Sequence, residues 1–324
     1  MNTIFTYMLS TDFFVAIVRM TTPLFLCSMG VLIVRKSGVV CIAFESMMLV
    51  AAFGGVIGSA YSQNLWVGTL AGLAFSVSFA LLFGYFVLVL KANNMLVSLA
   101  LNTLGSGGTV FLLYALTGDK GNTTSLKSLQ FPMIEIPLIK DIPFVGEILS
   151  GCNLMTYIAW ISVPLVYLLL FKTPMGLRIR AVGENPDAAE SLGTSANKVR
   201  FIALIIAGIL VGLSGMYMSM GYVPYFTRDM IAGRGFIAIA AQNLGGSMPF
   251  ATLIWSLVFG ISSAIANAFQ SVSIPPEFLK MFPYAATIIG LMMVGIVENR
   301  KTASQKNLLR KSALESVSDR PEKK

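Results

Sequence analysis

Ionisable side chains are nearly absent from the long apolar stretches of this chain, and the two exceptions are Arg19 and Glu45. A charged group at membrane depth is costly, so it normally faces a protein interior or a water-filled cavity. These two residues therefore either form an ion pair that joins two helices or line a path for a solute. Two such groups are too few for a proton relay, in which several ionisable side chains follow one another.

Residues that commonly catalyse reactions or bind metals are scarce. The chain has no histidine, and its three cysteines, Cys27, Cys41 and Cys152, form no CxxC pair. Histidine is the commonest metal ligand and a frequent general base, and thiolate metal sites need characteristic cysteine spacings. We therefore expect no catalytic residue, no metal site and no cofactor bound by this chain.

Neutral polar residues are more frequent within the apolar stretches. Ser98, Asn102 and Ser106 recur every four residues, so they share one face of a helix. Gln242 and Asn243 are adjacent in a later stretch. Such groups either form hydrogen bonds between helices or provide a hydrophilic lining. A lining with so little charge suits an uncharged or zwitterionic solute better than an ion.

A charged segment, residues 172–200, separates two apolar stretches and contains the signals of a short helix. Asparagine is a good N-cap, and proline suits the first helical position. Acidic side chains are stabilising near a helix N-terminus, and glycine commonly ends a helix. These signals are, in order, Asn185, Pro186, Asp187, Glu190 and Gly193. A helix with defined ends in a water-facing loop of a membrane protein predicts docking to a soluble partner.

The composition is that of a membrane protein, because 56% of the residues are hydrophobic and 12% are charged, against about 25% charged in soluble domains. A bilayer-spanning helix needs roughly 20 apolar residues, which predicts an all-α polytopic membrane protein with about nine spans, in a range of about eight to ten. The predicted spans are 13–34, 39–60, 66–90, 95–116, 153–171, 201–222, 235–247, 249–268 and 282–297.

Lysine and arginine are distributed unevenly around these spans, which predicts their orientation. Most basic residues fall on the side of the 172–200 segment and the C-terminal tail, so this side is cytoplasmic and the N-terminus is outside. The transmembrane domain is predicted to cover 1–299 with an external loop at 117–152, and a polar cytoplasmic tail, 300–324, lies near the membrane lipid. The net charge of +8 reflects this distribution, and no nucleic-acid-binding motif accompanies it.

Four segments resemble one known family, the permease subunits of bacterial ABC importers for branched-chain amino acids, simple sugars and nucleosides. They are 37–49 (SGVVCIAFESMML), 92–102 (ANNMLVSLALN), 173–189 (TPMGLRIRAVGENPDAA) and 233–246 (GRGFIAIAAQNLGG). The third is the most specific, and with GRGF it is most similar to the nucleoside and simple-sugar branch. Cys41 stands where the family usually has Asn, and Ala43 and Ser46 stand where it has Gly.

The resemblance implies a type II-like ABC-importer permease bundle in the bacterial cytoplasmic (inner) membrane. It implies three protein partners: an ABC ATPase that binds ATP and magnesium, a second permease subunit, identical or homologous, and an extracytoplasmic binding protein. Its ATPase-coupling residues would be Arg178, Arg180, Glu184, Asn185, Pro186, Asp187, Ala188, Ala189, Glu190 and Gly193. Its substrate pathway would include Glu45, Asn93, Ser98, Asn102, Ser106, Gln242 and Asn243.

The chain contains no GxxxxGK[ST] phosphate-binding loop, so a separate subunit is expected to hydrolyse ATP. We therefore expect a non-catalytic transport subunit that translocates a small polar solute. A nucleoside or a simple sugar is favoured, and some members of this branch carry flavins or other vitamins. The alternative is a secondary transporter or channel for a small neutral solute, which would draw on an ion gradient.

Overall fold

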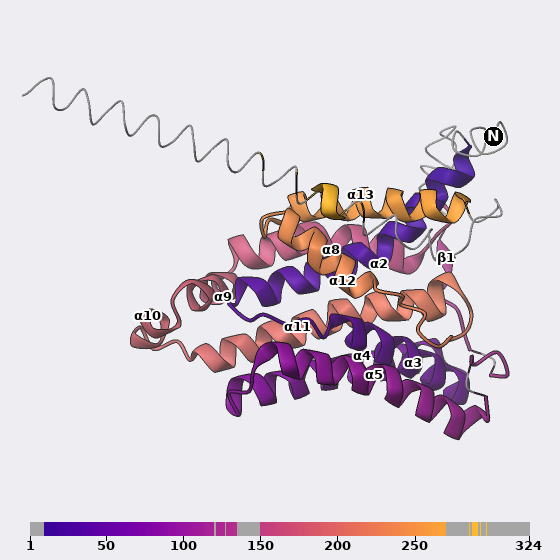
Figure 1. Cartoon of the computed structure of the whole chain (residues 1–324), viewed down its shortest axis with the longest axis horizontal. Helices are drawn as coiled ribbons and strands as arrows, with labels where there is room; N and C mark the ends of the chain where they lie inside the picture. The colour runs from indigo at the N-terminus through magenta and orange to yellow at the C-terminus, as the bar shows by residue number, and fades with distance from the viewer. Residues whose placement is uncertain are drawn as a thin grey trace, which may run out of the picture.

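The computed structural model describes residues 10–119, 121–126, 128–134 and 150–269, together with 285, 287–290, 292 and 296. Most of its helices run roughly along one direction and form a bundle (Figure 1). The elements are α2 (Thr11–Lys36), α3 (Phe44–Ser62), α4 (Leu65–Gly84), η1 (Tyr85–Val89), α5 (Asn94–Thr117), β1 (Met133–Ile134), β2 (Cys152–Asn153), α8 (Leu154–Lys172), α9 (Pro174–Glu184), α10 (Pro186–Ser191), α11 (Ala196–Met216), η2 (Tyr217–Tyr222), α12 (Arg234–Leu244) and α13 (Pro249–Ala268). The π-helical turns η1 and η2 extend α4 and α11.

Seven of the described helices are long and apolar enough to cross a membrane: α2, α3, α4 with η1, α5, α8, α11 with η2, and α13. Each overlaps a predicted span. The predicted span at 235–247 corresponds to a shorter helix, α12, which has 11 residues and ends at Leu244. A helix of that length rises about 16 Å, half of the hydrocarbon thickness of ~30 Å. The predicted span at 282–297 falls largely outside the described residues.

The central helix of the bundle is α11, which contacts α2, α3 and α4. Small residues bring these helices together. A Cβ atom at Gly212 would lie 2.9 Å from the Cβ of Ser76 on α4, and Gly215 packs directly on the backbone of Met48 on α3. Because lipid tails provide no hydrophobic drive between helices, such close packing is a main source of association.

Exposure differs greatly between the apolar helices. Within the most apolar 18 residues of each helix, 89% are buried in α2 and 28% are buried in α5. A helix that is apolar on all sides and buried belongs to the interior. Thus α2 forms part of the core, while α5 lies at the edge of the bundle, where its apolar side chains are available to lipid (Figure 1).

The predicted external loop, 117–152, packs against the connection that follows η2. The Thr123 amide donates to the carbonyl of Phe226, and the Phe226 amide donates to Oγ1 of Thr123, each at 2.9 Å. Strands β1 and β2 form a short antiparallel pair. We call this part of the molecule the β1–β2 end; α9 and α10 lie at the opposite, α9–α10 end (Figure 1). Residues 120, 127 and 135–149 of the loop and the tail 300–324 lie outside the described residues.

Candidate functional site

The predicted capped helix is present as α10. The side chain of Asn185 accepts a hydrogen bond from the Ala188 amide at 3.0 Å, and Pro186 is the first helical residue. Gly193 has a φ of +81°, a left-handed value that favours glycine, and its amide donates to the carbonyl of Glu190 at 2.9 Å. The N-cap and the glycine stop are therefore confirmed.

A second short helix, α9, precedes α10 and was not predicted. Oγ1 of Thr173 accepts from the Gly176 amide at 3.2 Å, and Pro174 follows the cap, so the Thr-Pro pair was a readable start signal. Gly176 packs on the backbone of α8, and Gly183 packs on the carbonyl of Lys36 at the end of α2. These backbone contacts connect α9 rigidly to two membrane-length helices.

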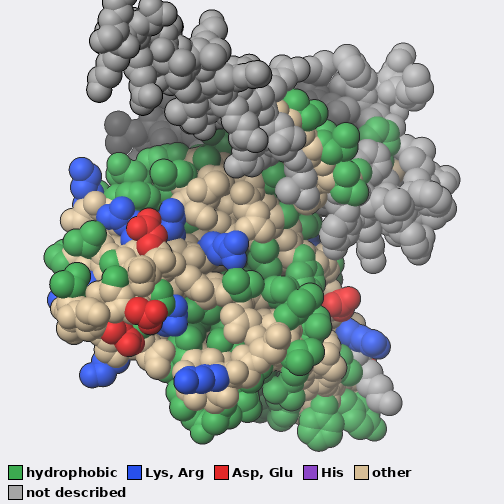
Figure 2. Space-filling model, turned by 60° about the vertical axis from the view of Figure 1, so that its left-hand side comes forward, with side chains coloured by type: hydrophobic (Ala, Val, Ile, Leu, Met, Phe, Trp, Pro, Cys, Tyr) green, Lys and Arg blue, Asp and Glu red, His purple; other side chains and the backbone are tan. Residues whose placement is uncertain are grey.

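Most of the predicted coupling residues lie on the outer surface of the α9–α10 end. The exposed ones are Arg178, Glu184, Asn185, Asp187, Ala188, Glu190 and Gly193. Pro186 is half-buried, and Ala189 is buried in a cluster with Ala196 at the start of α11. Figure 2 shows acidic and basic side chains gathered on this end of the molecule. A free charged surface around a helix seated on the bundle is suited to a protein partner.

Arg180 differs from the other charged residues of this group. Its guanidinium carbon lies 4.9 Å from the ring centroid of Phe171 on α8, and its Nε is buried. Such a cation–π contact stabilises the packing of the two helices. Arg180 therefore braces α9 against α8, whereas Arg178 is exposed.

Leu192, directly after α10, was not among the predicted coupling residues. Its side chain is 87% exposed, although leucine is usually buried. Its position at the end of the capped helix was visible in the sequence, but its exposure was not.

The second predicted span is discontinuous, because helix α3 begins at Phe44 and not at residue 39. Residues 39–42 form no helix, and within this segment Val39 and Cys41 are buried. Backbone polar groups at membrane depth must find partners within the protein. Oγ of Ser98 accepts from the Ile42 amide at 3.1 Å, while Asn102 donates to the Ile42 carbonyl and accepts from the Ser46 amide, both at 3.2 Å.

The polar residues of the α5 stripe therefore differ in their contacts. Ser98 and Asn102 form the hydrogen bonds between segments that were one of the two predicted alternatives. Ser106 is exposed and donates to the carbonyl of Thr103 in its own helix at 3.2 Å. Asn93 caps the N-terminus of α5, where its side chain accepts from the amides of Met95 and Leu96.

A second discontinuity follows η2. Residues 223–233 return into the bundle without forming a helix, and α12 then runs toward the α9–α10 end (Figure 1). The guanidinium of Arg234, the first residue of α12, lies 3.9 Å from the sulfur of Met20, near the middle of α2. Thus α12 begins beside α2.

The two discontinuities meet at Glu45, in the first turn of α3. Its Oε1 accepts from the Gly233 amide and its Oε2 accepts from the Gly235 amide, each at 2.7 Å. A carboxylate at a helix N-terminus is favoured by the helix dipole and by charge-assisted hydrogen bonds. A Cβ atom at Gly235 would lie 2.7 Å from Glu45 Oε2, so only glycine permits this approach. Glu45 therefore fastens the start of α12 to the start of α3.

The structure forms no ion pair between Arg19 and Glu45, both of which it describes. The carboxylate of Glu45 is engaged by the two glycine amides. Arg19 is exposed near the β1–β2 end, where it neighbours Cys152 and Tyr217. The alternative that these two charges join two helices as a pair is therefore wrong.

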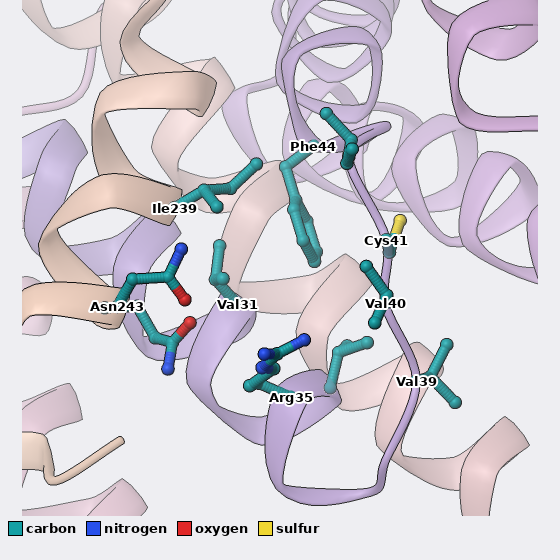
Figure 3. Close-up of a pocket in the computed structure, with 11 residues that line it drawn as sticks. Val31, Arg35, Val39, Val40, Cys41, Phe44, Ile239 and Asn243 are labelled. Carbon is teal, nitrogen blue, oxygen red and sulfur yellow. The ribbon is translucent and has the colours of Figure 1, made fainter. Parts of the chain in front are cut away.

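A pocket of about 170 Å³ lies beside this junction, toward the α9–α10 end (Figure 3). Asn243, from α12, lies on one side of it, Val39 and Val40 lie on the other, and Arg35, from the last turns of α2, lies between them. Gln242 also lines the pocket, but it is buried and its Nε2 donates to Oγ of Ser247 at 2.6 Å. We call this space the inner pocket. Gln242 and Asn243 thus both line the inner pocket, and Gln242 in addition forms a hydrogen bond within the protein.

Discontinuous helices that meet inside a membrane bundle are typical of transporters, which bind and gate solutes at such breaks. Together with the seven membrane-length helices, they define a polytopic membrane transport subunit. The sequence profile described as the branched-chain amino acid transport system / permease component matches residues 13–297. The chain belongs to this family.

Three similar proteins are described as ABC transporter permease proteins. The chain is 33% identical over 280 residues to the guanosine ABC transporter permease protein NupQ of Bacillus subtilis, which covers 83% of this chain and 87% of the relative. It is 30% identical over 284 residues to the nucleoside ABC transporter permease protein NupC of Lactococcus lactis, and the match covers 84% of this chain and 89% of the relative. It is 30% identical over 293 residues to the putative glucose ABC transporter permease protein TsgC13 of Haloferax volcanii, and the match covers 84% of this chain and 88% of the relative.

These findings confirm the family resemblance and the nucleoside and simple-sugar branch. The chain is a permease subunit of an ABC importer and a multi-pass protein of the inner membrane. The sequence did not show that Gly233 and Gly235 bind Glu45, because 188 and 190 residues separate these partners.

Proposed function

We propose that this chain forms the membrane path of an importer for a nucleoside, with a simple sugar as the second candidate solute. Two of the three relatives named above are described for guanosine or nucleosides, and one is described for glucose. The junction between the discontinuous segments carries the proposal, because its inner pocket is lined by two amide side chains, Gln242 and Asn243, the guanidinium of Arg35, and apolar groups. Neutral solutes with several hydrogen-bonding oxygens match such a lining.

In the proposed topology the N-terminus is outside and the C-terminus is cytoplasmic. The seven membrane-length helices, the discontinuous crossing made by 223–233 with α12, and a last crossing at 282–297 together give nine crossings. The α9–α10 end is then cytoplasmic, in agreement with the basic residues along 172–200.

We propose that α10 docks into a groove on a separate ATPase, which binds ATP and magnesium, while this chain binds no cofactor of its own. The exposed charges of Arg178, Glu184, Asp187 and Glu190 would set the orientation, and Leu192 would fill an apolar hollow. Because α9 is packed on the backbones of α8 and α2, a movement of the ATPase would be transmitted to the bundle.

The complete importer would contain a second permease, identical or homologous, and an extracytoplasmic binding protein that delivers the solute. Surrounding lipid would cover the exposed apolar faces. Within this chain, we assign the gate to the contact between Glu45 and α12. Separation of the two segments there would open the inner pocket toward the other half of the bundle.

The test is ATP-driven uptake by the purified importer in proteoliposomes with its binding protein, using radiolabelled guanosine, glucose and riboflavin in parallel. We expect uptake of guanosine that stops when the P-loop lysine of the ATPase is replaced by alanine. Undiminished uptake in that variant, or abolition by a protonophore while ATP is held constant, would support a secondary transporter instead.

A further inference from the structure

A second pocket, of about 180 Å³, lies at the β1–β2 end of the bundle, opposite the proposed ATPase-docking surface. We call it the outer pocket. One water needs roughly 10–15 Å³ of such space, so the outer pocket has room for an organic solute. Its polar lining residues are Arg19, Gln130, Ser150, Asn153, Thr156 and Tyr217.

The polar groups of the outer pocket are fixed by the fold. Nδ2 of Asn153 donates to the carbonyl of Phe131 at 3.2 Å, and its Oδ1 accepts from the Met155 amide at 3.0 Å. The hydroxyl of Tyr217 forms hydrogen bonds with Thr22 and Thr156. Asn153, Thr156 and Tyr217 are all buried. A site held in this way is preorganised, which lowers the entropy cost of binding.

Arg19 provides the main set of free donors in the outer pocket. It is exposed, and within the described part of the chain it forms no ion pair. None of the described residues that line the pocket is acidic. A cation would therefore be repelled, whereas hydroxyl and carbonyl oxygens would accept hydrogen bonds from the guanidinium. The ring of Tyr222, which is 40% exposed, offers an apolar face beside these donors.

We propose that the outer pocket is the first binding site of the solute in this subunit, and that it takes an uncharged ring compound bearing several hydroxyl or carbonyl oxygens. Arg19 binds the oxygens, and Tyr222 packs against the ring. A nucleoside has both features, and a hexose has the first. The inference rests on the proposed function, because it assumes that the β1–β2 end faces the side from which the solute arrives.

Cys152 lines the same pocket and supplies a probe that does not depend on transport. Burial raises the pKa of its thiol above the ordinary value, and the charge of Arg19 partly opposes this rise. Because the thiolate is the reactive form, labelling by iodoacetamide is best followed at mildly alkaline pH. The modified peptide is quantified by mass spectrometry, with the purified importer in nanodiscs and guanosine, uridine or glucose added separately.

We expect a nucleoside to slow the labelling of Cys152, about tenfold at nine times its Kd, because the free fraction is then about one tenth. The Arg19→Gln variant should need at least about tenfold more solute for the same protection, since a charged hydrogen-bond donor is lost. Protection is expressed as a ratio with and without solute, because this change also alters the thiol pKa. Arg228→Gln removes an exposed charge that does not line the pocket and should leave protection unchanged.

A cysteine introduced at the exposed Ser125 should be labelled at a rate that no solute changes. Absence of protection in an importer that takes up the same solute would overturn the outer pocket as a binding site. Equal protection in Arg19→Gln would overturn the role of Arg19. Absence of ATP-driven uptake by the unmodified importer would instead contradict the proposed function.

Discussion

Glu45 connects segments that lie far apart in the chain. Its two carboxylate oxygens accept from amides 188 and 190 residues away, each at 2.7 Å. Hydrogen bonds to a charged group contribute roughly 1.5–3 kcal/mol each. This contact links the start of α3 to the start of α12, and its loss should affect the path more than the stability of the surrounding helices.

We expect Glu45→Gln to lower ATP-driven uptake by at least about tenfold, because an amide offers one acceptor where two amide donors need partners. Gly235→Ala should have a similar effect, since the added Cβ would lie 2.7 Å from Glu45 Oε2. Uptake is measured in proteoliposomes at matched protein content. The double variant should be no worse than either single one, because both changes break the same contact.

Asp12→Asn is the matched control for Glu45→Gln, because Asp12 is exposed in the first turn of α2. It should transport at the normal rate. Normal uptake by Glu45→Gln would show that Glu45 does not form part of the gate.

Asn102 and Ser106 share one face of α5 but should respond differently to substitution. Asn102→Leu leaves the Ile42 carbonyl and the Ser46 amide without a side-chain partner, which should lower the free energy of unfolding by about 1–3 kcal/mol. Ser106→Ala should change it by less than about 0.5 kcal/mol, since Ser106 is exposed. Thermal unfolding in detergent measures both, and equal midpoints would contradict the structural role of Asn102.

At the scale of elements, α9 and α10 combine a rigid attachment with an exposed surface. Their caps define where each helix begins and ends, and the glycine contacts hold α9 on α8 and α2. A flexible docking loop would absorb the movement of a partner. In the proposed function, the packing of α9 on the backbone of the bundle would transmit it.

Leu192→Asp should weaken the association with the ATPase by about tenfold or more, because an apolar anchor is typically worth at least about 2 kcal/mol at the centre of an interface. A pull-down with the purified ATPase measures this. Ser195→Asp is the matched control, since it introduces the same charge three residues further on at the exposed N-cap of α11, where aspartate is well tolerated. Equal binding of both variants would exclude Leu192 as an anchor.

At the scale of the whole molecule, the proposed orientation places the two ends of the bundle in different compartments. Cysteines introduced at Ser125, in the 117–152 loop, and at Ser195, beside α10, are both exposed. In intact cells, a membrane-impermeant maleimide should label the first and not the second. The reverse pattern would invert the topology, and labelling of both would show that the membrane does not separate these ends.

The sequence alone determined the features that depend on neighbouring residues. Apolar stretches of sufficient length predicted the seven membrane-length helices, because a crossing helix satisfies its backbone internally and needs only apolar side chains. The signals from Asn185 to Gly193 predicted α10, since capping bonds reach only a few residues. The motifs of 173–189 and 233–246 were sufficient for the family.

Tertiary structure alone decided where the helices are interrupted and what the polar residues do. Residues 39–42 are as apolar as a helix would be, yet they are non-helical, and Ser98 and Asn102 of α5 bind the backbone amide and carbonyl of Ile42 instead. The partner of Glu45 and the neighbours of Arg19 were likewise fixed by contacts between distant segments. Periodicity and spacing carry no information on such contacts, so the sequence could name these residues but could not pair them.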